Sequence, residues 1–157
     1  MDWTTLVPVI VGGVIGVVGT IVGPPLVHWL NEKAAKRKQR IEKLGELIAV
    51  VYENDDWLDL YRNVNVFGIE KELGPSPFPK IVAITAIHFP QFNQLINEFD
   101  LVVGHYKLWV LKGGKKRLDK QIDKLAEGFD QVNEPYLEKR NEVLRTLKEY
   151  AKAEFGE

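Results

Sequence analysis

Apolar residues fill the first part of the chain in a pattern that the rest of the sequence does not repeat. Between Leu6 and Leu30 there is no Asp, Glu, Lys or Arg. An uncharged stretch of about 18 residues or more is typical of a transmembrane helix. As a helix it would be about 37 Å long at about 1.5 Å per residue, which exceeds the roughly 30 Å hydrocarbon layer and leaves room for tilt. The pattern predicts a transmembrane anchor over residues 1–31.

The residues that flank this stretch indicate how it crosses the membrane. Trp3 and Trp29 bracket it, and indole rings favour the headgroup level. No basic residue precedes it, unlike in a cleavable signal peptide. By the positive-inside rule, the basic residues that follow predict a single-pass inner-membrane protein with its N-terminus outside and its C-terminus in the cytoplasm. The residues expected at the lipid headgroups are Trp3, Trp29, Lys33, Lys36, Arg37, Lys38 and Arg40.

Small residues recur on one face of the predicted anchor. They are Gly12, Gly16, Gly19 and Gly23, with Thr20 beside them. Spacings of four, three and four form two Gly-x-x-x-Gly units on one helix face, where two backbones can approach closely in lipid. The pattern predicts a homo-oligomer that packs through this face. The alternative is that glycine is simply common in membrane helices.

Residues 32–63 have the pattern of a stalk that continues into a first bundle helix. Polar residues follow the anchor, and then Ile41, Leu44, Leu47, Val51 and Leu58 recur at helical spacing. Two places are expected to interrupt the helix. At Pro24-Pro25 the lost amide donors predict a kink, or a stop and a restart. At Asn54-Asp55-Asp56 an acidic residue could cap a new start.

The remainder reads as a loop over 64–79 and further bundle helices over 80–157. Residues 80–89 are rich in β-branched side chains, but no other segment offers a strand partner, so a short buried helix is expected. From Phe92 to Trp109 apolar residues follow one helical face. Gly113-Gly114 is expected to end that helix, and Pro135 to bend a last helix over 115–155. Its predicted coiled-coil-like stripe contains Leu118, Ile122, Leu125, Phe129, Val132 and Tyr136.

Together these patterns predict an all-α protein with an N-terminal single transmembrane helix and a cytoplasmic antiparallel bundle of three to four helices. Its 157 residues suit an anchor and one domain, and the formal net charge of −1 argues against a nucleic-acid partner. The chain has no cysteine, which excludes disulfides and thiolate metal sites.

No group of residues forms a recognisable catalytic, cofactor or metal motif. Asp55 and Asp59 would share a helix face, for which solvation is the ordinary interpretation. His105 and Glu98 lie two turns apart, and two ligands do not make a metal site. Arg62 lacks the histidine that follows four to six residues later in HEPN-type ribonucleases. We therefore expect no enzyme and no cofactor.

The layout resembles small single-span helical-bundle membrane effectors of prokaryotic defence systems, including pore-forming accessory proteins of RNA-targeting CRISPR systems. The resemblance covers the architecture and rests on no shared residue motif. It implies a self-associating membrane protein that forms a pore or perturbs the bilayer in antiviral defence. The alternative is a membrane-tethered adaptor or scaffold whose bundle binds a cytosolic protein partner.

Overall fold

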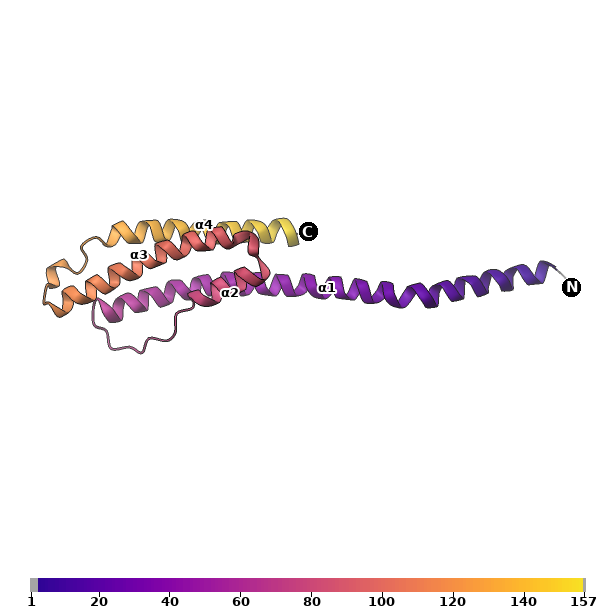
Figure 1. Cartoon of the computed structure of the whole chain (residues 1–157), viewed down its shortest axis with the longest axis horizontal. Helices are drawn as coiled ribbons and strands as arrows, with labels where there is room; N and C mark the ends of the chain where they lie inside the picture. Colours follow the sequence, from indigo (N-terminus) through magenta and orange to yellow (C-terminus); the bar gives the residue numbers. More distant parts are fainter. Residues whose placement is uncertain (1–2, 157) are drawn as a thin grey trace. The chain divides into compact units, whose positions relative to one another are not determined.

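The computed structural model describes the backbone of residues 3–156 and the side chains of residues 27–156. The described part contains four α-helices, two 3-10 turns and no strand, so the prediction of an all-α helical bundle is confirmed (Figure 1). The helices are α1 (Trp3–Asn65), α2 (Phe78–His88), α3 (Asn93–Leu118) and α4 (Phe129–Phe155).

Two compact units make up the chain, residues 1–40 and residues 41–157. Within residues 27–156, whose side chains are described, no helical segment is long and apolar enough to cross a membrane. Most of the predicted anchor falls before residue 27. The side chains of Trp3, Gly12, Gly16, Gly19, Thr20 and Gly23 lie outside the described residues.

Helix α1 runs without a break from Trp3 to Asn65. The restart expected at Pro24-Pro25 and the new helix start expected at Asn54-Asp55-Asp56 are therefore wrong. In the acidic cluster the reason is tertiary packing. Asn54 and Leu58 are buried, and Asp55 pairs with an arginine of α4, so these residues are held as parts of a helix instead of capping one.

The ambiguous segment after the proline-rich loop is a helix, as expected. Helix α2 begins at Phe78, where Pro79 can occupy the first turn because its missing N–H is not needed there. It buries Phe78, Ile81 and Ile84, which recur every three residues, and Thr85, which follows Ile81 by four. Helical spacing thus outweighs the β-branched composition in this segment.

Gly113-Gly114 does not end helix α3, which continues to Leu118. A Cβ atom on Gly113 would lie 2.9 Å from a Val66 methyl carbon, and one on Gly114 would lie 3.2 Å from the Asn65 carbonyl oxygen. Both glycines therefore let α3 pass close to the end of α1. The prediction treated them as a helix stop, whereas their role is close packing.

Helix α4 begins at Phe129, so the predicted helix start at Lys115 is wrong as well. Residues 119–128 form an irregular turn in which Lys120 has φ 60° and Gly128 has φ 77°. Because left-handed backbone is incompatible with a continuous α-helix, the two helices are separate. Leu118 and Ile122 do not join the buried stripe and are 77% and 61% exposed, whereas Leu125 and Tyr136 are buried. Helix α4 passes through Pro135.

The core of the second unit lies where α1, α2, α3 and α4 face one another. Helices α3 and α4 pack side by side in opposite directions, and α2 packs on α3 (Figure 1). The predicted face is buried at Phe92, in the turn just before α3, and at five residues of α3, which are Ile96, Phe99, Val103, Tyr106 and Trp109. Aromatic rings from three helices meet here: Phe99 lies 5.6 Å from Phe78 and 5.9 Å from Tyr136 between ring centroids.

Ion pairs between helices make the bundle sensitive to acid. The Glu46 carboxylate of α1 accepts hydrogen bonds from the ammonium groups of Lys43, at 2.6 Å, and of Lys80 in α2, at 2.9 Å. These hydrogen bonds lower the pKa of Glu46 from 4.5 to about 2. In the same way, hydrogen bonds from Lys139 of α4, and then from Gln94, lower the pKa of Glu98 of α3.

A carboxyl group whose pKa is lower in the folded state stabilises the fold above its unfolded pKa and loses that effect as the pH falls. We expect the melting temperature to drop as the pH falls from about 4.5 towards 2. Glu46→Gln should make the drop shallower, as measured by circular dichroism at several pH values. An equally steep drop in the variant would contradict this role for Glu46.

Candidate functional site

The described part of the predicted membrane interface is exposed and charged. Trp29 is 55% exposed, and the Lys33 ammonium lies 5.3 Å from its ring centroid. Lys36 pairs with Glu32 at 2.6 Å, and this hydrogen bond lowers the pKa of Glu32. Arg37 and Lys38 are exposed, and Arg40 is half-buried. The cationic side chains are thus accessible on this part of α1.

Inside the bundle, three side chains form a polar cluster between α1 and α4. The Tyr136 hydroxyl donates to the Asp55 carboxylate at 2.9 Å, and Arg140 donates to the other oxygen of the same carboxylate. Burial, and then the nearby charge of Asp55, raise the pKa of Tyr136 well above its usual range. Tyr136 therefore stays protonated and serves as a donor that helps hold the carboxylate.

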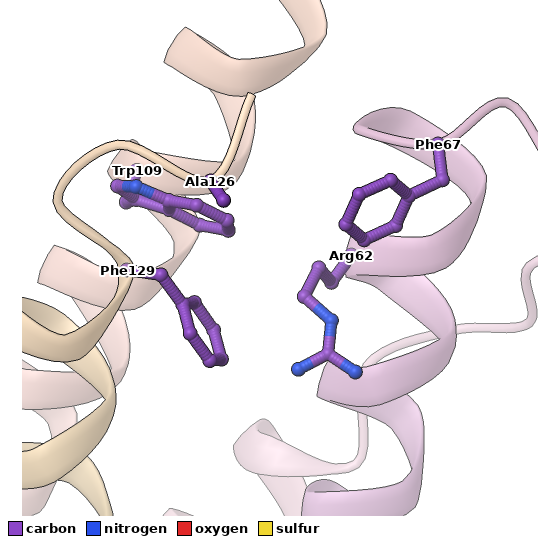
Figure 2. A pocket seen from close by; sticks show the side chains of 5 residues that line it. All are labelled: Arg62, Phe67, Trp109, Ala126 and Phe129. Carbon is purple, nitrogen blue, oxygen red and sulfur yellow. The ribbon is translucent and has the colours of Figure 1, made fainter. Parts of the chain in front are cut away.

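Arg62 reaches from α1 towards Phe129 and makes contacts with three side chains inside the bundle (Figure 2). Its guanidinium donates to the Tyr106 hydroxyl at 3.2 Å, pairs with Asp59 at 3.1 Å and lies 5.2 Å from the Phe129 ring centroid. Its Nε is buried and has no hydrogen-bond partner. The Phe129 ring supplies a cation–π contact to the guanidinium.

Two hollows adjoin at Arg62 and Phe129. The first is an apolar hollow of about 270 Å³ in which Trp109 and Phe129 face Arg62 and Phe67 (Figure 2). The second, of about 290 Å³, is more polar and contains the Asp55 and Asp59 carboxylates. Both are close to the lower limit of about 300 Å³ for small-molecule sites.

The charged side chains that line the polar hollow are paired with one another. Asp55 pairs with Arg140 and Asp59 pairs with Arg62, so the face shared by the two aspartates holds ion pairs and not a bare acidic cluster. Among the described residues no three His, Asp or Glu side chains gather where they could hold a metal ion. His105 lines another hollow, with Leu108, Lys112 and Gln131. Ser76 accepts a hydrogen bond from the Phe78 amide at 3.4 Å in the loop before α2.

Sequence patterns had singled out Asp55, Asp59 and Arg62, but not the partners that Asp55 and Arg62 find on other helices. Tyr136 and Arg140 lie 81 and 85 residues after Asp55, and Tyr106 lies 44 residues after Arg62. Contacts over such distances follow from the packing of α1 against α3 and α4, and no local spacing signals them. Comparison of the chain with family models, curated proteins and solved structures found no match.

Proposed function

We propose that this chain is a single-pass membrane protein that self-associates through its N-terminal segment and acts as a pore-forming or membrane-perturbing effector of the antiviral-defence type. The observation that carries the proposal is the absence of charged residues from Leu6 to Leu30. Such a stretch is long enough to span the hydrocarbon layer as a helix. The bundle then lies on the cytoplasmic side, next to the basic residues.

The described end of this segment supports the proposal. Val27, Trp29 and Leu30 are 55%, 55% and 49% exposed, so they do not contribute to a core within the chain. An indole ring with a lysine beside it suits the boundary between lipid and water, where the ring lies among headgroups and the ammonium remains hydrated. Lipid is therefore the partner that these side chains fit.

Self-association rests on the glycine face of the segment. By helical periodicity Gly12, Gly16, Gly19 and Gly23 share one side, and close backbone packing on that side can assemble several spans. An assembly of spans is the simplest way for a chain with one span to conduct ions or to disturb the bilayer. Thr20 can add a hydrogen bond between spans.

The test is the oligomeric mass of the detergent-solubilised full chain, measured for wild type and for Gly16→Ile with Gly19→Ile. We expect wild type to be an oligomer and the double variant to have a smaller mass, because branched side chains separate the backbones of the anchors. Ion flux from liposomes that contain the double variant should also be lower than from liposomes that contain wild type. A matched control carries Val14→Phe with Val17→Phe, which adds bulk on the opposite side and should leave the mass unchanged.

Each outcome bears on a different part of the proposal. A monomeric wild type would overturn self-association and with it the pore. An oligomer whose mass does not change with the glycine substitutions would overturn the contact through the anchor. Oligomers that release no ions would favour the second candidate, a membrane-tethered adaptor whose bundle binds a cytosolic protein. The exposed apolar residues on α3 are the observation that favours this candidate.

A further inference from the structure

Helix α3 has a second apolar face, which points away from the core. Leu101, Leu108, Leu111 and Leu118 are 66%, 49%, 56% and 77% exposed. Helix α4, by contrast, has no large hydrophobic residue of comparable exposure. Single exposed leucines are ordinary on a protein surface, but four on one side of one helix need an explanation.

The spacing of these leucines is that of a coiled-coil seam. With Gly104 and Lys115 they recur at intervals of three, four, three, four and three residues, which is the heptad pattern of helices that pack along their length. We call these six residues the leucine face. They lie nearly opposite the buried positions of α3, such as Phe99, Val103 and Tyr106.

The middle of the leucine face is open enough for another helix to come close. A Cβ atom built on Gly104 would meet nothing within 4 Å, whereas one on Gly113, on the core side of the same helix, would meet Val66. Beside Leu108 lies a hollow of about 350 Å³ that reaches Val132 of α4. A seam residue of a facing helix can insert beside Leu108.

We infer that the leucine face packs against the leucine face of a second copy of this chain, with the two α3 helices antiparallel. A two-fold axis midway between Leu108 and Leu111 sets Leu101 opposite Leu118 and Leu108 opposite Leu111 of the other copy. Every exposed leucine then meets a leucine. A face that complements itself in this way is what a two-fold symmetric contact requires.

Charge and volume favour the antiparallel arrangement over the parallel one. Parallel helices in register would place Lys115 against Lys115 and Gly104 against Gly104, which brings like charges together and leaves a gap. In the antiparallel arrangement Lys115 lies opposite Gly104, so its aliphatic stem covers the open space. Its ammonium can then reach Asp100, which is exposed and lies one turn from Gly104.

This contact goes beyond the proposed function, because it needs neither the anchor nor its glycines. If the anchor also self-associates, each chain carries two different self-contacts.

The absence of cysteine from the chain permits a direct test by disulfide cross-linking. Full-length Leu101→Cys and Leu118→Cys, coexpressed with different tags and oxidised in detergent, should form a mixed disulfide several-fold more than either forms with itself. In the antiparallel arrangement the two Leu101 positions lie about 25 Å apart, while a disulfide joins Cα atoms about 4.4–6.8 Å apart. Circular dichroism should show unchanged helicity.

A control variant, Ile87→Cys, places an equally exposed thiol on α2, outside the leucine face, and should not cross-link. Cross-linking of Leu101→Cys with itself would overturn the antiparallel arrangement, and no cross-link above the Ile87 control would overturn the contact. Repeating the experiment with Gly16→Ile and Gly19→Ile separates the two proposals. A mixed disulfide that persists there supports the α3 contact even if the anchor does not associate.

Discussion

Replacing Phe99 by alanine is expected to lower the free energy of unfolding of the bundle by about 3–5 kcal/mol. Phe99 of α3 is completely buried and packs on Phe78 of α2 and on Tyr136 of α4. Its removal takes away the transfer free energy of a large side chain and leaves a cavity that three helices must close. Denaturant unfolding of the full chain in detergent, followed by circular dichroism, measures the change.

Phe67→Ala is the matched control for this prediction. It removes the same side chain from a position that is 50% exposed, so the expected loss is about 1.5 kcal/mol or less. If both variants lost the same free energy, the bundle would not be organised around the aromatic cluster at Phe99.

The core face of α3 was predictable because its residues repeat with the helical period. Phe92, Phe99 and Tyr106 recur every seven residues, and this spacing alone places them on one side of a helix. Gly113-Gly114 misled the prediction because a glycine pair usually weakens a helix. Here α3 can approach Val66 only because Gly113 has no side chain, and that approach is a property of the packed bundle.

The polar cluster and the leucine face were not predictable for related reasons. Asp55 and Arg140 belong to different helices, and only the packed bundle brings them together. Leu118 was assigned to a buried stripe of the last helix because it lies four residues before Ile122. That assignment depended on where one helix ends and the next begins, and the turn at Lys120 and Gly128 moves Leu118 into α3.

Replacing Asn54 by leucine is expected to raise the free energy of unfolding by about 1–3 kcal/mol. Asn54 is completely buried in the bundle, and neither polar atom of its side chain has a hydrogen-bond partner. The amide lies near the Tyr136 hydroxyl, but this proximity does not make up for the lost contacts with water. Leucine has a similar shape and nothing to desolvate.

Asn54→Ala separates the effect of removing the unpaired amide from the effect of filling its space with an apolar side chain. Alanine also removes the unpaired amide, but it leaves a cavity, so its gain should be smaller than that of leucine or become a loss. Denaturant unfolding of both variants gives the comparison.

If leucine destabilised the bundle, Asn54 would have a role that its burial alone does not show. Asn54 directly precedes Asp55, and a buried amide can fix how neighbouring helices align at the cost of stability. The pairing of Asp55 with Tyr136 and Arg140 would then depend on Asn54, and loss of that pairing in the leucine variant would reveal it.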